Sequence, residues 1–250
     1  MTQEKANDKE RIAKYLARAG VASRRGVEAM IGEGRIKLNG KVLDTPATLV
    51  DGTEDIRVDN KPIGGKEPTR LFLFHKPGDL VTSHNDEKGR ETVFDYLKLQ
   101  YPDLPRLISV GRLDLTTEGL LLLTNDGELS RYMELPKTGW VRTYRVRVYG
   151  SWDEQKTKKL ANGIKVDGVQ YGQIKVEYEG ETGDNRWLYV SLQEGKNREI
   201  RKVMEAVDVK VNRLIRTSYG PFQLGKLPRG SVMEVQQKQL KNSLLKGLID

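Results

Sequence analysis

The stretch VGRLDLTTEGLLLLTNDGEL, residues 110–129, carries the strongest fold signal in the chain. Its apolar run, Leu120 to Leu123, is short and leads into Asn-Asp-Gly, a turn sequence. A short apolar run closed by turn residues is typical of a buried strand. The GELSRYMEL that follows favours a short helix. This stretch therefore predicts a core strand in a fold that mixes strands and helices.

Segments on both sides of this stretch show the same mixture. LFLFHKPG (71–78) indicates a buried strand that ends in a turn, and RETVFDYLKL (90–99) a helix. Period-two alternation predicts three further strands, in RTYRVRVYG (142–150), QYGQIKVEYEG (170–180) and RWLYVSLQEG (186–195). NREIRKVMEAV (197–207) predicts a helix whose apolar face is formed by Ile200, Val203, Met204 and Val207.

The N-terminal part of the chain is rich in basic residues. Only Glu10, Glu28 and Glu33 oppose the basic side chains between residues 9 and 41, which are Lys9, Arg11, Lys14, Arg18, Arg24, Arg25, Arg35, Lys37 and Lys41. The whole chain has a net charge of +8 and a pI of about 9.4. Such a balance favours a polyanionic partner through counterion release. A basic surface that is merely solvated would have the same composition. The spacing of these residues must therefore distinguish a polyanion-binding surface from a solvated one.

The spacing predicts two helices and a hairpin. In ERIAKYLARAG (10–20) the apolar residues recur at helical intervals. Ser23 is placed to cap a second helix, which runs from residue 24 to about residue 33. RIKLNGKVL (35–43) then alternates around Asn39-Gly40, a strong hairpin signal.

LARAGVASRR (16–25) and GRIKLNGKV (34–42) resemble the RNA-binding domain named after ribosomal protein S-four. The resemblance covers about residues 10–58 and implies a domain over residues 8–59 that grips structured RNA through its phosphates. The basic residues that it assigns to this contact are Arg18, Arg24, Arg25 and Lys37. NKPIGGKEPTR follows, and residues 60–69 are expected to form a flexible linker.

Several protein classes are excluded by composition. The chain has no cysteine and two histidines, which argues against disulfides, thiolate zinc sites and His-rich metal sites. Its apolar runs are far shorter than the ~20 residues of a spanning helix, and the polar start MTQEKANDKE lacks the pattern of a secretory signal. We therefore expect a cytoplasmic protein without a membrane partner and without a metal site built from cysteine or histidine.

Residues 110–129 resemble the signature motif of the RsuA and RluB group of pseudouridine synthases. Four more motifs agree in order: HKPG (75–78), RTYRVRV (142–148), EGKNREIRKVMEAV (194–207) and VNRLIRTSYGPFQLGKLPRGS (211–231). The resemblance implies an α+β protein, with the small helix-helix-hairpin domain followed by a mixed α/β catalytic domain over residues 70–236. That domain is expected to have a largely antiparallel sheet and a central cleft, with a helical or frayed tail over residues 237–250.

The family implies isomerisation of uridine to pseudouridine in ribosomal RNA, free or within a ribosomal precursor particle, by a monomeric enzyme. Because this reaction only rearranges atoms, we expect no metal and no cofactor. EGKNREIR is more similar to the RluB branch, which modifies large-subunit RNA, than to the RsuA branch. Two alternatives remain open, a small-subunit substrate and a non-catalytic RNA-binding or ribosome-assembly factor. A glycosidase-like hydrolase is less favoured, because no clear pair of acidic residues emerges.

The resemblance assigns three catalytic residues. Asp114 is the nucleophile, Tyr144 stacks on the target uracil, and Arg201 is the basic residue that pairs with Asp114. The residues alone favour a turn or cap aspartate at position 114, and only the resemblance favours the nucleophile. Tyr144 could be an ordinary cross-strand aromatic residue, and Arg201 an ordinary surface residue.

Further basic and polar residues are assigned to the RNA. The target base must leave its stack to reach Asp114, and Arg112 is the candidate to fill the gap, or else simply to pair with phosphate. Lys196, Asn197 and Arg198 begin a helix and suit phosphate. Two departures from the family pattern are His75, expected to be a satisfied turn residue, and Asp208, which can adopt the left-handed conformation where glycine is usual.

Overall fold

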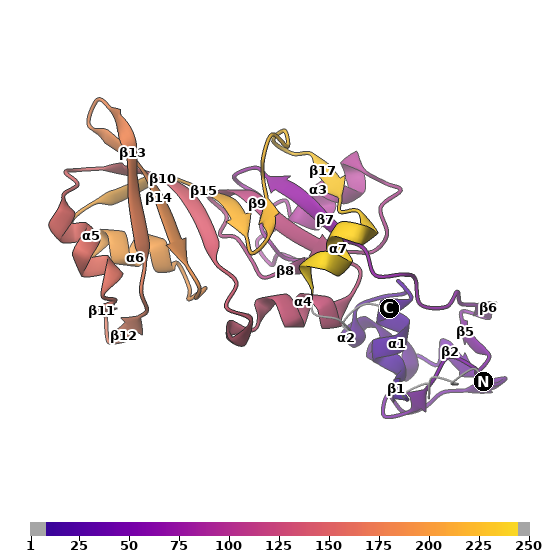
Figure 1. The fold of residues 1–250 in the computed structure, drawn as a ribbon. Coiled ribbons are helices and arrows are strands. Elements are labelled where there is room, and N and C mark those ends of the chain that lie inside the picture. Colours follow the sequence, from indigo (N-terminus) through magenta and orange to yellow (C-terminus); the bar gives the residue numbers. More distant parts are fainter. Residues whose placement is uncertain (1–8, 245–250) are drawn as a thin grey trace. The chain divides into compact units, whose positions relative to one another are not determined.

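The computed structural model describes residues 9–244, so the last six residues of the expected tail and the first residue of the expected N-terminal domain lie outside the described residues. Contacts divide the chain into two units, Met1–Thr69 and Arg70–Asp250 (Figure 1).

The first unit begins with two short helices, α1 (Ile12–Arg18) and α2 (Arg24–Gly32). Ser23 caps α2, because its hydroxyl accepts a hydrogen bond from the backbone N–H of Gly26 at 3.0 Å. The two helices and the strands bury one small core, which includes Ile12, Leu16, Val27, Ile31, Ile36 and Val50.

The strands of the first unit are β1 (Glu10–Arg11), β2 (Ile36–Leu38), β3 (Lys41–Val42), β4 (Leu49–Val50), β5 (Ile56–Val58) and β6 (Lys61–Pro62). Strands β2 and β3 form an antiparallel hairpin in which Asn39 (φ 49°) and Gly40 (φ 82°) are both left-handed. The hairpin belongs to a four-stranded sheet of order β3-β2-β5-β6. Its last strand falls inside the expected linker, because Lys61–Pro62 pairs with β5, so irregular backbone begins only after Pro62.

The second unit is built on a nine-stranded sheet of order β13-β14-β10-β15-β9-β7-β17, with β16 paired to β15 and β8 paired to β9. The strands are β7 (Leu71–Lys76), β8 (Ile108–Val110), β9 (Thr117–Thr124), β10 (Arg142–Tyr149), β13 (Lys175–Thr182), β14 (Asn185–Leu192), β15 (Lys210–Tyr219), β16 (Phe222–Gln223) and β17 (Val232–Glu234). Every pairing in this described sheet is antiparallel except the central one, β9 with β15. The sheet is therefore mixed and rich in antiparallel pairs.

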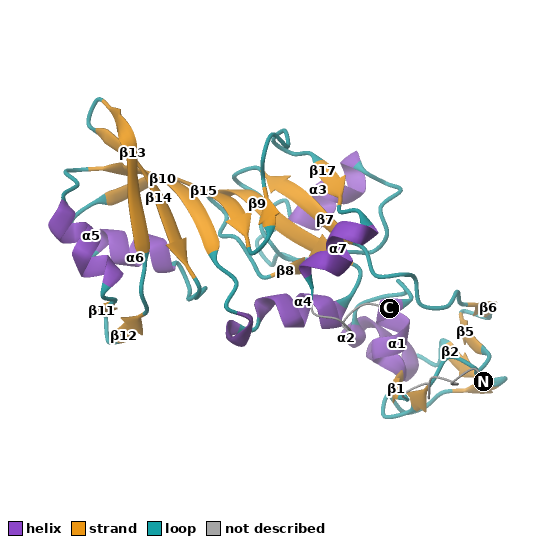
Figure 2. Ribbon diagram, in the orientation of Figure 1, coloured by secondary structure: helices purple, strands orange, loops and turns teal. Residues whose placement is uncertain are grey.

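Most helices of the second unit follow the local signals, and α5 is the exception because the sequence analysis did not predict it. They are α3 (Val93–Gln100), α4 (Gly127–Glu134), α5 (Glu154–Ala161), α6 (Glu199–Glu205) and α7 (Gln237–Ser243), with a short 3-10 turn at Pro136–Thr138. Helices α5 and α6 lie on one face of β10, β13 and β14 (Figure 2). Val146 and Val148, which alternate along β10, pack in one hydrophobic core with Ile200, Val203 and Met204 of α6. These three residues belong to the apolar face that the helical periodicity predicted.

Some predicted boundaries are wrong. QYGQIKVEYEG is not one strand: its first residues belong to β12 (Val169–Tyr171), which pairs with β11 (Ile164–Val166), and β13 starts at Lys175. The strand is interrupted there because the backbone N–H of Ile174 donates to the carbonyl of Leu160, at the end of α5, and not to a neighbouring strand. His75 lies within β7, not in a turn, and its Nδ1 is 2.8 Å from the carbonyl of Leu227.

Gly119 is expected to be the most restrictive glycine of the central parallel pair. It has φ 101°, and a Cβ placed there would lie 2.3 Å from the backbone oxygen of Arg216 on β15. We expect Gly119→Ala to destabilise the protein by about 3 kcal/mol or more, because two paired strands would have to separate. Gly139→Ala is the control. That residue is also left-handed (φ 64°) but has open space around it, so it should cost about 1 kcal/mol. Urea denaturation of both variants measures the difference, and equal losses would contradict the steric explanation.

Candidate active site

A cleft of about 1020 Å³ opens in the second unit. Its walls come from the loop between β8 and β9, from β10, from the end of β14 and from the start of α6. The cleft brings together every site residue that the sequence predicted in this unit, namely Arg112, Asp114, Tyr144, Lys196, Asn197, Arg198 and Arg201. These residues lie far apart in the chain, so their convergence results from the folding of the sheet.

Asp114 lies in the loop between β8 and β9, and other elements hold that loop in place. The backbone N–H of Thr117 donates to the carbonyl of Asp114 at 3.0 Å, which closes a tight turn. The hydroxyl of Thr82 donates to the carbonyl of Leu113 at 2.8 Å. The side chain of Asp114 is about one-third exposed. Its carboxylate is thus presented on a fixed backbone and remains accessible to a ligand.

Lys76 also fixes the loop between β8 and β9. This lysine is fully buried at the end of β7, and its ammonium donates to the carbonyls of Asp114 (3.3 Å), Leu115 (3.2 Å) and Thr117 (2.9 Å), and to that of its neighbour Pro77 (3.0 Å). Burial lowers the pKa of Lys76 to about 8, and nearby acidic groups counteract that shift. The sequence analysis did not assign Lys76. The sequence did contain a signal for this residue, because Lys76 ends a largely apolar strand and stands immediately before proline, in LFLFHKPG.

The cation nearest to Asp114 is Arg198. Its guanidinium lies 3.7 Å from the carboxylate, and both side chains are partly exposed. Arg201, which was predicted to make this pair, instead donates to the hydroxyl of Thr116 at 3.0 Å and to the carbonyl of Val211 at 3.1 Å. Burial is the main cause that lowers the pKa of Arg201, and the charge of Arg198 adds to it, while Asp114 opposes the shift. Arg201 therefore supports the Asp114 loop through Thr116.

Arg198 reaches Asp114 because its backbone is left-handed. It stands at the N-cap of α6 with φ 52° and ψ 30°, a conformation that costs a non-glycine residue free energy. Glu199 holds this turn, because its buried carboxylate accepts the backbone N–H of Lys196 at 2.9 Å. Burial raises the pKa of Glu199. A regular helical start would have directed the Arg198 side chain elsewhere.

Tyr144 contributes to the wall of the cleft from β10. It is 9% exposed and lies between Val190 of β14 and Arg216 of β15 in the sheet register. A shift in register between Thr143 and Tyr144 marks an irregularity of the ladder at this point. Its ring is therefore held in a fixed place, as a stacking partner would need to be.

Two arginines of the cleft wall were not assigned from the sequence. Arg142 donates to the hydroxyl of Tyr219 at 2.8 Å and to two carbonyls at the end of β14. Arg216 is 2% exposed and donates to the carbonyl of Leu120 at 2.7 Å, with one terminal nitrogen left without a partner. Both arginines stand in quoted motifs, but nothing in sequence spacing shows that their side chains face a cleft.

The predicted RNA-binding residues differ in their surroundings. Arg112 and Asn197 are exposed on the cleft wall, while Lys196 forms an ion pair with Glu194 and also donates to the carbonyl of Gln170 at 2.8 Å. In the first unit, Arg24 and Arg25 are exposed at the start of α2, Lys37 is half-buried on β2, and Arg18 donates to the hydroxyl of Thr69 at 3.0 Å.

Within residues 9–244, no three acidic or histidine side chains gather in the manner of a metal site. No helix in the same range has the length and apolar character needed to cross a membrane.

Comparison with known proteins identifies the family of the chain. The family model described as RNA pseudouridylate synthase matches residues 70–206, and the S4 domain model matches residues 10–56. A Rickettsia bellii protein, named as an uncharacterized RNA pseudouridine synthase, is 43% identical over 232 residues, which cover 93% of this chain and 99% of that protein. The ribosomal large subunit pseudouridine synthase B of Salmonella typhimurium is 41% identical over 253 residues, covering 96% and 84% of the two chains.

A crystal structure of a pseudouridylate synthase superimposes with a TM-score of 0.65 at 25% identity, and covers 94% of this chain and 99% of that one. The chain belongs to the RNA pseudouridine synthase family. It is an isomerase that acts on RNA, with a pseudouridine synthase fold and an S4 domain at its N-terminal end.

Proposed function

We propose that this enzyme converts a specific uridine of large-subunit ribosomal RNA to pseudouridine, with Asp114 as its nucleophile. The observation that carries the proposal is the cleft, in which an accessible carboxylate on a fixed loop faces a basic wall that includes a fixed tyrosine. The large-subunit substrate is supported by relatives named for that subunit, such as the Salmonella typhimurium enzyme.

The reaction breaks the bond between C1′ of the ribose and N1 of uracil and forms a bond from C1′ to C5. C5 loses its proton to solvent, and N1 takes up a proton, so the product is an isomer of the substrate. Because atoms are only rearranged, the change needs no redox or group-transfer partner. Asp114 supplies covalent catalysis while the base is detached. Tyr144 packs against the uracil and holds it near the sugar. The guanidinium of Arg198 lies 3.7 Å from the carboxylate of Asp114 and balances its negative charge in the cleft.

The target base reaches Asp114 by leaving its stack in the RNA, at a cost of a few kcal/mol. Arg112 is the residue best placed to offset this cost. It is exposed and stands two positions before Asp114 on the wall of the cleft. A planar guanidinium can stack where the base has left and can bind phosphate as well.

The first unit holds the RNA through its helix-helix-hairpin face. Arg24 and Arg25 are exposed in the first turn of α2, where free backbone N–H groups add to their charge. These contacts recognise the shape of folded RNA and are expected to be strongly salt-dependent. The second unit alone supplies the chemistry.

The test uses large-subunit and small-subunit ribosomal RNA transcripts that carry tritium at uridine C5. The enzyme should release tritium from the large-subunit transcript, or from an immature large-subunit particle. Release from the small-subunit RNA alone would overturn the substrate, and no release from either RNA, free or in particles, would identify a binding factor instead.

Arg198→Gly is expected to raise stability and lower activity together. Glycine relieves the left-handed strain, so the free energy of unfolding should rise by about 1 kcal/mol, while tritium release should fall about tenfold or more because Asp114 loses its nearest cation. Arg198→Ala is the control, since it loses the charge but keeps the strain. Thermal melting and the tritium assay measure both effects. If Arg198→Gly and Arg198→Ala were equally stable, the strain at this position would be negligible.

A further inference from the structure

A second hollow of the second unit lies outside the cleft. It has a volume of about 220 Å³ and is bounded by α3, the loop before α3 and the segment before β8. We call it the flank pocket and define it by His84, Phe94, Lys98, Tyr101, Leu104 and Arg106. Its lining residues include two cations and no aspartate or glutamate. The pocket is therefore suited to an anionic ligand with an apolar or aromatic part.

Arg106 is a cation that has no acidic partner among residues 9–244. It is half-buried, and burial lowers its pKa. Among the residues that the structure describes, its guanidinium has no hydrogen-bond or ion-pair partner. A guanidinium that is partly removed from water is costly unless an anion or an acceptor binds it. A negatively charged group such as phosphate would therefore stabilise the guanidinium of Arg106 in the flank pocket.

His84 offers a flat surface beside this charge. Its ring is stacked on Phe94, with ring centroids 3.7 Å apart and an angle of 10° between the planes. His84 is exposed as a residue and lines the flank pocket, so a planar group that enters the pocket can contact it. Burial against its neighbours lowers the pKa of His84, and Arg106 adds to this shift while Asp95 opposes it. Each of the two largest causes favours the neutral ring, so the contribution to binding that we assign to His84 is stacking.

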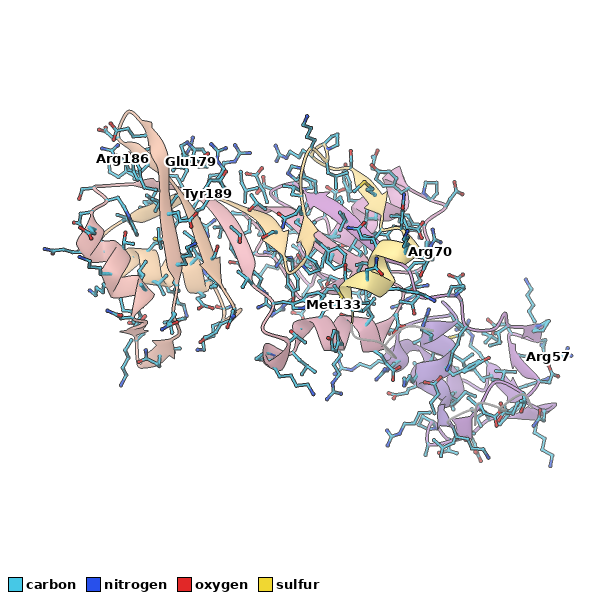
Figure 3. All side chains as sticks on the ribbon, viewed as in Figure 1. Arg57, Arg70, Met133, Glu179, Arg186 and Tyr189 are labelled. Carbon is cyan, nitrogen blue, oxygen red and sulfur yellow. The ribbon has the colours of Figure 1, made fainter. Side chains whose placement is uncertain are left out.

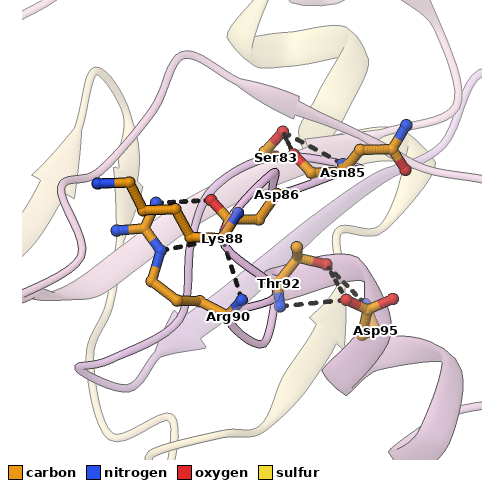
Figure 4. Close-up of polar contacts among 7 residues, drawn as sticks. All are labelled: Ser83, Asn85, Asp86, Lys88, Arg90, Thr92 and Asp95. Atoms are coloured by element: carbon orange, nitrogen blue, oxygen red, sulfur yellow. Dashed lines mark hydrogen bonds and ion pairs between the residues drawn. The ribbon is translucent and has the colours of Figure 1, made fainter.

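Hydrogen bonds constrain the loop that carries His84, and Figure 4 shows these contacts. Asp86 accepts hydrogen bonds from the backbone N–H groups of Lys88 (3.1 Å) and Arg90 (3.0 Å) and from the guanidinium of Arg90. At the end of the loop, Thr92 and Asp95 cap α3 reciprocally. A stacking surface on such a loop loses little conformational entropy when a ligand binds.

The same loop connects the flank pocket to the cleft. Thr82 and Arg90 line the cleft, and His84, between them in sequence, lines the flank pocket. The segment at β8 does the same, with Ser109 in the cleft and Arg106 in the pocket. The two hollows are separated by only a few residues of chain on each side. One strand of RNA that passes through the cleft could reach both.

We propose that the flank pocket binds one unpaired nucleotide of the substrate RNA close to the target uridine, with its base stacked on His84 and its phosphate on Arg106. This inference rests on the proposed function, because it takes RNA as the ligand of the cleft. Aromatic stacking beside a basic group is the usual way to hold single-stranded RNA. An acidic peptide would satisfy Arg106 but would leave the stacking surface unused.

The experiment measures affinity and catalysis separately, on the full-length chain and a large-subunit ribosomal RNA transcript. His84→Ala and Arg106→Gln should each weaken RNA binding about tenfold, the loss expected for one stacked base or one phosphate contact. The kcat for tritium release at saturating RNA should stay within about twofold of wild type, because neither residue lines the cleft. His84→Phe should restore affinity, since it keeps the stacking surface. Lys159→Gln, an exposed lysine of α5, is the control for lost charge.

Two further readouts distinguish this site from general effects. Arg106→Gln should reduce the slope of log K against log salt concentration by about 1, the amount for one phosphate contact. His84→Ala should leave this slope unchanged. A transcript that contains 4-thiouridine should cross-link on irradiation to peptides within residues 84–107. Circular dichroism and thermal melting verify that both variants fold.

The inference is overturned if both variants bind RNA as Lys159→Gln does and no cross-link falls within residues 84–107. It is also overturned if His84→Phe binds as weakly as His84→Ala, because stacking would then play no part. A chain that binds and cross-links as expected but releases no tritium would instead refute the proposed catalytic function and leave the RNA site standing.

Discussion

Asp114→Asn is expected to abolish tritium release, with a loss of about 10³-fold or more in kcat, which corresponds to about 4 kcal/mol of transition-state stabilisation. The amide has the shape of the carboxylate but cannot act as a nucleophile. Stability should change little, because the side chain is partly exposed and its ion pair to Arg198 is 3.7 Å long. RNA affinity should remain close to that of the wild type, since the phosphate-binding cations are untouched.

Asp79→Asn is the matched control for this result. Asp79 is an exposed aspartate that acts on Lys76 through its charge, but it is not among the residues that line the cleft. It should retain activity within a few-fold of wild type. Equal activity in Asp114→Asn and the wild type would remove Asp114 from the mechanism, and equal losses in both aspartate variants would show that the effect is a general loss of negative charge.

Lys76→Met is expected to have the largest effect on folding. Methionine matches the length and the apolar stem of lysine but leaves the carbonyls of Pro77, Asp114, Leu115 and Thr117 without their buried donor. Removing the donor from a buried polar cluster costs about 3–5 kcal/mol. The loop that presents Asp114 should lose its fixed geometry, so activity should fall at least as steeply as stability.

Denaturant unfolding and the tritium assay measure the two losses at a temperature where the variant is folded. Lys210→Met, an exposed position on β15, is the control and should be nearly neutral in both measurements. A Lys76→Met protein with wild-type stability would mean that the carbonyls find other donors, and the role of Lys76 in fixing the loop would have to be abandoned.

Local patterns predicted the parts of the fold that depend on local physics. The Asn39-Gly40 turn, the Ser23 cap and the apolar face of α6 each follow from a few adjacent residues. Asp208 has φ 58°, so it does adopt the left-handed conformation where the family usually has glycine. The expectation that the assigned residues share one cleft came from the family motifs. The order of these residues along the chain does not by itself place them together.

The remaining features depend on long-range contacts. The parallel pairing of β9 with β15 cannot be inferred from alternation in either strand. Arg198 replaced Arg201 as the nearest cation to Asp114 because a single left-handed residue redirects the side chain, and an arginine gives no local signal for that conformation. The role of Lys76 depends on four carbonyls, three of which are distant in the sequence. Helix α5 was missed because its eight residues bury only Leu160.

The central parallel pair also bears on when the enzyme becomes competent during its synthesis. Thr117 on β9 pairs with Leu214 on β15, and most of the second unit lies between them in the chain. Contacts of such long sequence separation form slowly, because a large loop must close before they contribute. The loop with Asp114 is synthesised before β15, so the strand beside it emerges from the ribosome later than the loop does. The nascent chain therefore has its RNA-binding unit well before it has a complete cleft, so it can meet RNA earlier than it can modify it.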